Sequence, residues 1–138
     1  MTPPRTYTHP DADDLVLARV LYALSDPVRL EMVRRLASVE EADSLDLADD
    51  LPRSTLTYHT RILRENGVTF TRSQGRSCLI SLRFDDVERR FPGLLKSLIV
   101  SLEEEHAGQG GVDRAQRSPR AEPADLFRAH GPLARAPT

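Results

Sequence analysis

The sequence predicts a mainly α-helical domain that carries one β-hairpin. Apolar residues recur at helical spacing in several segments within residues 11–66 and again within 85–106. Between these regions, from Val68 to Leu82, the period changes to two, and Gly75 lies where a hairpin would turn. The 138 residues suit one domain. Its folded part should have about 100 residues, a size at which dimerisation adds useful stability.

The first helix is expected within residues 11–24, where the acids Asp11, Asp13 and Asp14 suit a helix N-terminus. Its main apolar face consists of Leu17, Val20, Leu21 and Leu24. A second, narrower apolar stripe consists of Leu15, Ala18 and Tyr22. Because a helix with two apolar sides usually has two neighbours, we expect one side to contact the domain core and the other a second subunit.

The next three helices have recognisable starts and stops. Asp26 is expected to cap a helix over residues 25–38, and an acidic loop at 40–43 follows it. Ser44 is expected to cap a short helix over 44–51, and Pro52 opens a longer helix that stops at Asn66 and Gly67. The apolar faces of these helices consist of Val28, Leu30, Met32, Val33, Leu36, Leu45, Leu47, Ala48, Leu51, Leu56, Ile62 and Leu63.

A final helix is expected over residues 85–106, interrupted near Phe91 and Pro92. Its apolar face is large for a terminal helix and consists of Leu94, Leu95, Leu98, Ile99 and Leu102. Burial against a second subunit explains such a face. We therefore expect a flexible N-terminus at 1–9, a folded domain at 10–106, and a disordered tail rich in Gly, Pro, Arg and Ala at 107–138.

Charge is distributed unevenly along the chain, although the formal net charge is only −2. From Leu51 to Arg83 there are six arginines and one acid, Glu65, which gives a local charge of +5. Residues 40–50 contain six acids and no base, which gives −6. A basic region confined to one part of a chain is typical of a protein that binds a polyanion.

Composition excludes several classes of protein. Cys78 is the single cysteine, so neither an intramolecular disulfide nor a thiolate cluster for zinc is expected. No apolar run approaches the length of about 20 residues that a membrane span needs. The first ten residues lack the apolar segment of a secretory signal, so we expect a cytoplasmic protein. No Ser-His-Asp set or Gly-rich phosphate loop is found, and we expect neither an enzyme nor a cofactor.

The order of the expected elements is that of a winged helix-turn-helix. The short helix over 44–51 and the helix after Pro52 form the helix-turn-helix, and the hairpin that follows forms the wing. In this geometry the second helix lies in the major groove of DNA. The stretch LPRSTLTYHTRIL, residues 51–63, has Arg, Ser and Thr to contact bases and phosphates and no acid to repel them. Double-stranded DNA is the expected partner.

Three motifs resemble the ArsR/SmtB family of small winged-helix repressors: LYALSDPVRLEMVRRL, LPRSTLTYHTRILRENGV and RSQGRSCLISL. The matching residues are Ala23, Leu24, Asp26, Pro27, Arg29 and Leu30, then Ser54, Thr55, Thr57, His59, Leu63, Arg64 and Gly67, then Gly75 and Arg76. The resemblance covers residues 15–105. It implies a homodimer joined through the first and last helices, which a ligand releases from its operator.

The sequence departs from the family pattern at positions that matter. Thr60 replaces the usual Leu, and Asp49 replaces an apolar residue. The short helix has no cysteine, so the family's cysteine-pair metal site is missing. A second familiar metal site, on the last helix, would use Asp86 and Glu88, but its histidine is replaced by Ile99. The familiar metal sites are therefore not supported.

The residues expected to contact DNA are Arg53, Ser54, Thr55, Thr57, Tyr58, His59, Arg61, Arg64, Arg72 and Arg76. His59 has two interpretations, as a DNA contact or as a residue that packs inside the domain. Cys78 is interpreted as a small buried side chain, with a redox switch as the alternative. No metal site is predicted, but a weaker hypothesis joins His9, Asp11, Asp13, Glu103 and His106 of paired subunits around zinc or nickel.

The dimer interface is expected to contain Leu15, Ala18, Tyr22, Leu94, Leu95, Leu98, Ile99 and Leu102. The predicted function is that of a regulator, most simply a repressor, that binds a pseudo-palindromic operator as a homodimer. Two alternatives remain: a nickel- or zinc-responsive repressor that uses His and carboxylate ligands, and a winged-helix protein-interaction module without DNA binding. The residues leave the signal open among a metal ion, an oxidant, a small organic molecule and no signal at all.

Overall fold

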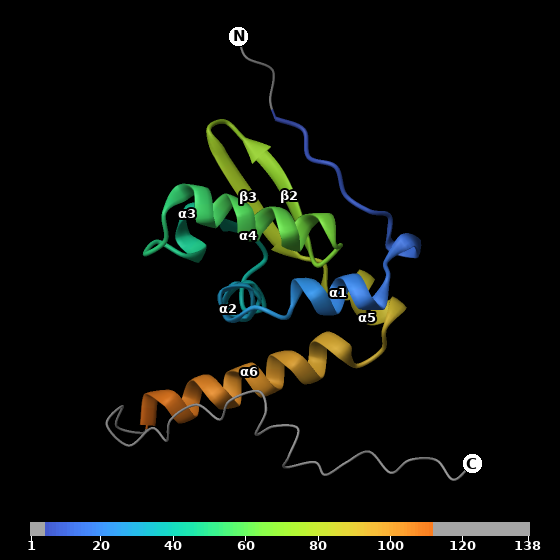
Figure 1. The fold of residues 1–138 in the computed structure, drawn as a ribbon, viewed down its shortest axis with the longest axis vertical. Coiled ribbons are helices and arrows are strands. Elements are labelled where there is room, and N and C mark those ends of the chain that lie inside the picture. The colour runs from blue at the N-terminus through green and yellow to red at the C-terminus, as the bar shows by residue number, and fades with distance from the viewer. Residues whose placement is uncertain (1–4, 112–138) are drawn as a thin grey trace, which may run out of the picture. The chain divides into compact units, whose positions relative to one another are not determined.

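A computed structural model describes residues 5–111, without the side chains of 110 and 111. In chain order its elements are a 3-10 turn (Ala12–Asp14), α1 (Leu17–Ala23), α2 (Pro27–Leu36), β1 (Ala42–Asp43), α3 (Ser44–Leu47), α4 (Arg53–Glu65), β2 (Thr69–Gln74), β3 (Ser77–Leu82), α5 (Phe84–Arg90) and α6 (Leu94–Gly111). Figure 1 labels them. The predicted helical fold with a hairpin wing is confirmed. The compact unit that contains it ends at Glu104, within α6.

The wing belongs to a three-stranded antiparallel sheet in the order β1-β3-β2. The hairpin pairs Thr69 with Leu82 and Gln74 with Ser77, and Gly75 takes a positive φ of 60° in the turn. β1 is not expected from the sequence, because the acidic stretch at 40–43 predicts a loop. Ala42 instead pairs with Ile80 of β3, which leaves β2 as one edge of the sheet.

A single core joins helices that are distant in the sequence. Its fully buried residues come from most helices and from the sheet, and include Val20, Met32, Val33, Leu36, Leu63, Val68, Ile80, Val87 and Leu95. The predicted inward faces of the second and fourth helices are therefore confirmed. The core fixes α4 against α2 and the hairpin, and so determines which side of α4 faces solvent.

The first helix was predicted too long. Residues Ala12–Asp14 form a separate 3-10 turn, and α1 begins only at Leu17, without a side-chain cap. Leu15 lies between the two in extended backbone and is 2% exposed. It packs closely on Gly67, where a Cβ atom would overlap the Leu15 side chain. Of the predicted apolar face, Leu17 and Leu21 are exposed instead of buried.

Caps explain where α2 and α3 begin. The predicted cap of α2 is confirmed, since the Asp26 carboxylate accepts hydrogen bonds from the backbone N–H groups of Val28 and Arg29. For α3 the predicted cap is wrong by one residue: Asp43, not Ser44, accepts from the Leu45 N–H at 3.0 Å. α3 also ends at Leu47, earlier than predicted, and Arg35 of α2 donates to the Leu47 carbonyl.

The predicted break near Phe91 and Pro92 is confirmed, and it separates α5 from α6. Gly93 takes a φ of 86° in the break. The Glu88 carboxylate then accepts hydrogen bonds from the N–H groups of Gly93 and Lys96 and so caps α6, which lowers the Glu88 pKa. α6 continues to Gly111, so residues 107–111, expected to be disordered, are helical. Residues 112–138 of the expected tail and residues 1–4 lie outside the described residues.

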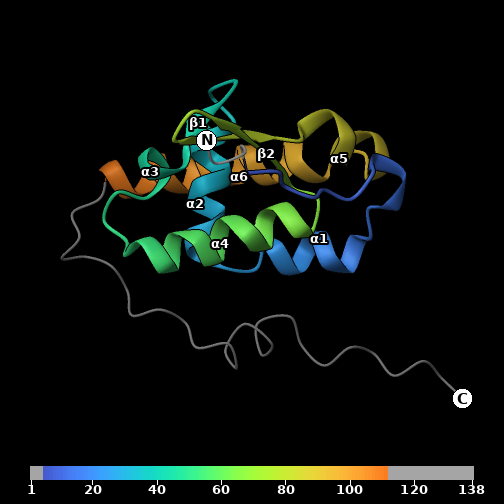
Figure 2. The ribbon, with the colours of Figure 1, turned by 90° about the horizontal axis from the view of Figure 1, so that it is seen from above.

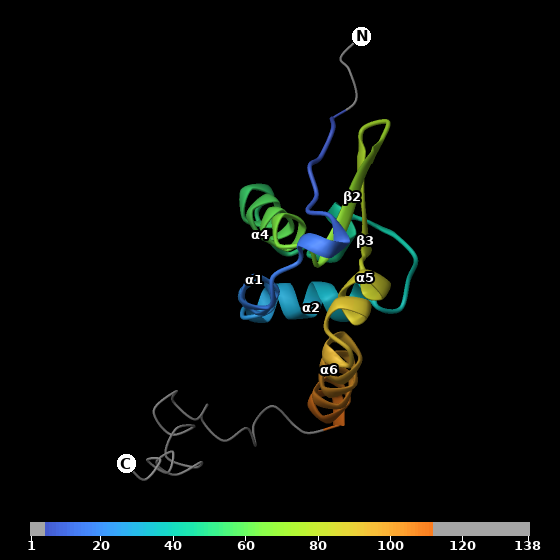
Figure 3. The same ribbon diagram turned by 90° about the vertical axis from the view of Figure 1, so that its right-hand side faces the viewer.

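Residues 5–11, which we call the N-terminal strap, lie along β2 between α4 and the hairpin (Figures 2 and 3). The expectation that this region is loose is not met for residues 5–9. The Thr71 N–H donates to Nε2 of His9 at 2.9 Å, and the His9 ring stacks on Phe70. Within residues 5–111, no helix has both the length and the apolar character that crossing a membrane requires.

Candidate nucleic-acid interface

α4 has one buried and one exposed side, as the sequence predicts. Its buried residues are Leu56, His59, Thr60, Ile62 and Leu63. Its exposed residues are Arg53, Ser54, Thr57, Tyr58, Arg61 and Glu65. These positions recur at intervals of three and four, so they form one continuous solvent-facing surface. We call this surface the α4 face, and Figure 2 shows the helix at the edge of the unit.

The α4 face is basic and polar at its N-terminal end. Arg53 lies in the first turn, and Thr57 donates its hydroxyl hydrogen to the Arg53 carbonyl at 2.9 Å. No acid lies in that turn, and no side chain caps the helix after Pro52. The first backbone N–H groups therefore lack a side-chain acceptor within the described residues. Arg61 is 53% exposed, and Glu65, at the far end, is 3.9 Å from it.

Two residues predicted to contact DNA point elsewhere. His59 is 7% exposed and lies inside the domain, so the packing interpretation is correct and the DNA contact is wrong. Arg64 is half-buried, and its guanidinium lies 4.9 Å from the centre of the Tyr7 ring in the N-terminal strap. Its Nε atom is buried without a hydrogen-bond partner. Thr55 is only partly exposed, at the margin of the α4 face.

Buried Arg29 holds His59 in place. The Arg29 side chain donates to the carbonyls of Ala23 at 2.7 Å and Tyr22 at 3.2 Å, and its Nη1 lies 3.1 Å from Nδ1 of His59. Because a guanidinium only donates, Nδ1 of His59 accepts, and the ring proton lies on Nε2. Arg29 thus connects the C-terminal end of α1, the start of α2 and the middle of α4.

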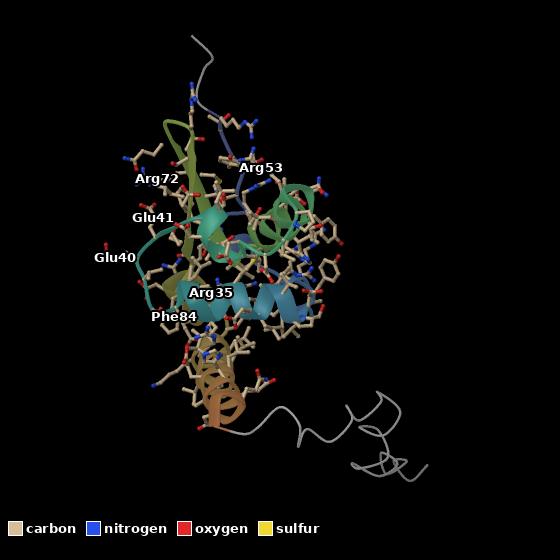
Figure 4. All side chains as sticks on the ribbon, turned by 90° about the vertical axis from the view of Figure 1, so that its left-hand side faces the viewer. Arg35, Glu40, Glu41, Arg53, Arg72 and Phe84 are labelled. Carbon is tan, nitrogen blue, oxygen red and sulfur yellow. The ribbon has the colours of Figure 1, made fainter. Side chains whose placement is uncertain are left out.

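The hairpin presents less positive charge than its sequence suggests. Arg72 makes two hydrogen bonds of 2.6 Å to the carboxylate of Glu41, and Figure 4 shows the two side chains together. This pairing lowers the pKa of Glu41 and raises that of Arg72. Arg72 is therefore engaged by an acid rather than free, contrary to expectation. Arg76, in the turn, is exposed.

The residues expected at a dimer interface divide into two groups. Leu15 and Leu95 are buried in the core of their own chain, at 2% and 0% exposure, so assigning them to an interface was wrong. Ala18 and Tyr22 are exposed on α1. The remaining residues of α6 are half-buried: Leu94, Leu98, Ile99 and Leu102.

The metal hypothesis gains no support from the geometry. Within the described residues no group of three or more His, Cys, Asp or Glu side chains is placed to hold a metal ion. Nε2 of His9, a proposed ligand, already accepts the Thr71 N–H. Burial, followed by the charges of Arg83 and Arg64, lowers the pKa of His9. Cys78 is half-buried, and a hydrogen bond with its thiol raises the pKa of Tyr7.

Sequence reasoning missed two features of this region. The sequence identifies Arg29 only as a residue that matches a family motif, and its buried hydrogen bonds are not predicted. The available clue is that a charged residue on the apolar side of a predicted helix indicates a buried hydrogen-bond network. The N-terminal strap gave no periodic signal at all. Its aromatic residues, Tyr7 and His9, were the available clue to a packed segment, because such side chains bury well against a sheet edge.

Comparison with known proteins gives one curated relative and several similar folds. No family model matches the chain. An uncharacterized HTH-type transcriptional regulator of Bacillus subtilis (strain 168), YceK, is 35% identical over 94 residues, which is 66% of this chain and 94% of the relative.

Solved structures that are similar to the chain include the following two. The repressor BigR from Xylella fastidiosa has 26% identity and a TM-score of 0.49, over 62% of this chain and 84% of its own. An ArsR family transcriptional regulator has 21% identity and a TM-score of 0.49, and the match covers 70% of this chain and 98% of that regulator.

Proposed function

The chain belongs to the HTH-type transcriptional regulators, of the ArsR type that its motifs resemble, and we propose that it binds double-stranded DNA through the α4 face as a homodimer. A regulator of this family is not an enzyme. The hairpin serves as the wing beside the bound groove. The simplest regulatory role is repression, in which the dimer occupies a pseudo-palindromic operator until a signal lowers its affinity.

The observation that carries this proposal is the chemistry of the α4 face. Its N-terminal half offers Arg53, Ser54 and Thr57 without an acid. Arg can bind a phosphate or the two acceptors of guanine, and hydroxyl groups can bond to any base. The uncapped N–H groups of the first turn add a favourable site for a phosphate. A helix with these properties suits the major groove.

Dimerisation is supported by apolar residues that one chain leaves exposed. Leu17, Leu21 and Tyr22 of α1 are 45–52% exposed. α6 adds the half-buried Leu98 and Leu102. Burial of these residues against a second copy would remove apolar surface from water and would place two α4 helices on one duplex. The half-sites would then lie about 34 Å apart, one turn of DNA.

The signal must bind the two states of the dimer with different affinity, since equal affinity shifts nothing. The short helix has no cysteine, so a signal through the family's cysteine site is not supported. Titration of zinc, nickel and copper into the protein–DNA complex, with and without chelator, tests the metal-responsive alternative. We expect no change in affinity. A metal effect that disappears in His106→Ala would establish that alternative instead.

Fluorescence anisotropy with the DNA upstream of the chain's own gene, at two salt concentrations, tests the proposal. We expect binding that weakens steeply with salt, because phosphate contacts release counterions. Arg53→Glu and Arg61→Ala should each weaken binding about tenfold or more. Arg89→Ala is the matched control, since Arg89 is 69% exposed on α5, away from the α4 face.

Two outcomes would contradict the assignment of the α4 face. If both variants bind as tightly as Arg89→Ala, another surface contacts the DNA. If the unaltered protein binds no DNA at either salt concentration, the protein-interaction alternative is favoured. Circular dichroism and sedimentation establish that each variant keeps its fold and its state of association.

A further inference from the structure

The N-terminal strap is anchored to the wing by its backbone and by one ring. The Ser73 hydroxyl donates to the Arg5 carbonyl at 2.8 Å, and the Thr71 N–H donates to His9 at 2.9 Å. At its other end, Arg83 donates to the Pro10 carbonyl at 2.7 Å. The His9 ring stacks on the exposed Phe70 with 4.3 Å between ring centres. The strap therefore covers the free edge of β2.

The strap also contacts the helix of the α4 face. The Arg64 guanidinium lies over the Tyr7 ring at 4.9 Å, an arrangement in which a cation is attracted to an aromatic face. Two independent views place the segment between α4 and the hairpin (Figures 2 and 3). A segment fixed on both sides loses little further conformational freedom when its exposed end binds a ligand.

Arg5 lies near the tip of the wing. Its carbonyl is bonded to Ser73, and the next residue, Gln74, pairs with Ser77 at the turn. Arg5 is exposed, and among the described residues no carboxylate lies within 4.0 Å of its guanidinium. The hairpin's own Arg72 is held by Glu41. Within the part of the chain that the structure describes, Arg5 and Arg76 are thus the exposed cations near this turn that have no carboxylate within 4.0 Å, whereas the exposed Arg72 has one.

We propose that Arg5 is a phosphate contact of the DNA complex, delivered by the N-terminal strap alongside the wing. This inference rests on the proposed function. The strap supplies a cation near the wing turn on the side of the hairpin that faces α4 (Figures 2 and 3). Arg72 and its partner Glu41 lie on the other side of the hairpin from Arg53 of α4 (Figure 4). A guanidinium suits a phosphate because its parallel N–H groups bond to two oxygens at once. The contact carries affinity rather than sequence preference.

The test compares Arg5→Ala, Arg5→Lys and Arg89→Ala in the full chain, by the dependence of DNA affinity on salt. Each lost phosphate contact lowers the slope of log affinity against log salt by about 0.9, so a dimer that loses two should lose about 1.8. We expect Arg5→Ala to show this change and to bind about tenfold more weakly. Arg5→Lys should keep most of the slope, and Arg89→Ala all of it.

A second variant tests the strap itself. His9→Ala removes the ring that accepts the Thr71 N–H and stacks on Phe70, so it should reproduce part of the Arg5→Ala loss. If Arg5→Ala keeps the slope of the unaltered protein while Arg61→Ala still weakens binding, the inference is wrong and the proposed function stands. If the unaltered protein does not bind DNA, both fail. If Arg5→Ala loses affinity by the same factor on operators that differ in their bases, the lost contact is to a phosphate; a loss confined to one base sequence would contradict this.

Discussion

Replacing Arg29 by Met should destabilise the domain more than any other single change to a charged residue in the described region. Arg29 is 4% exposed and makes hydrogen bonds to Ala23, Tyr22 and His59. Its guanidinium also lies 5.5 Å from the centre of the Tyr22 ring. Met is unbranched and of similar length, so it fills much of the space but donates nothing.

The magnitude follows from what each partner loses. The Tyr22 carbonyl keeps the Ser25 hydroxyl at 2.6 Å and the Ser25 N–H at 3.1 Å, so it stays satisfied. The Ala23 carbonyl and Nδ1 of His59 lose the side-chain donor that the structure gives them. An unsatisfied buried polar group costs about 1–3 kcal/mol, so two cost about 2–6 kcal/mol. Against a typical domain stability of about 5–15 kcal/mol, this is a large fraction.

Urea unfolding followed by circular dichroism measures the loss, at one fixed protomer concentration because association adds to stability. The double variant Arg29→Met with His59→Leu provides the decisive comparison. The double variant removes both Nδ1 of His59 and the Arg29 guanidinium that donates to it, so no unsatisfied Nδ1 remains. The double variant should therefore be about 1–2 kcal/mol more stable than the sum of the losses of the two single variants predicts. A loss below about 1 kcal/mol for Arg29→Met, or strict additivity in the double variant, would refute the network.

Two further predictions concern charge near the hairpin. Glu41→Gln should free Arg72, and DNA binding should then become several-fold tighter and depend more steeply on salt. The control is Glu40→Gln, because Glu40 has no ion pair to Arg72, and this variant should bind DNA as the unaltered protein does. Equal DNA affinity of the two variants would contradict the pairing. The pKa of His9 is lowered in the folded protein, so the unfolded state binds the proton more readily. Docking of the strap should therefore be complete above pH 6.5 and should weaken as the pH falls below 6.5. Hydrogen exchange at the Thr71 N–H, corrected for its intrinsic rate, measures the docking of the strap. Constant protection of this N–H as the pH falls would contradict the predicted pH dependence.

Elements with strong local signals were predictable from the sequence. Asp26 and Pro27 mark the start of α2 through cap chemistry that depends on neighbouring residues alone. The break between α5 and α6 follows from Pro92 and from Gly93, which takes a positive φ. The exposed side of α4 follows from periodicity, because the apolar positions dictate which side is buried. In each case the information lies within about one helical turn.

Elements that depend on distant contacts were not predictable in this way. β1 exists only because Ala42 meets Ile80, which the chain brings together from 38 residues away. In β2 the threonines Thr69 and Thr71 are buried, while Phe70 is 44% exposed and has the His9 ring stacked on it. A residue-type pattern assigns the opposite faces, since Phe is normally the buried member. The His9 ring that stacks on Phe70 comes from a segment about 60 residues earlier, so the local sequence of β2 does not indicate this contact.

The position of Tyr22 links the proposed dimer contact to the proposed DNA contact. Its ring is 52% exposed on α1, at the surface that we assign to dimerisation, while its carbonyl accepts a hydrogen bond from Arg29. The same guanidinium bonds to His59, whose backbone belongs to α4. A rearrangement that moved the end of α1 would have to stretch these bonds or carry α4 along, since packed interiors deform little. Under the proposed function, Arg29→Met should therefore weaken any effect of a signal on DNA affinity more than it weakens DNA binding itself.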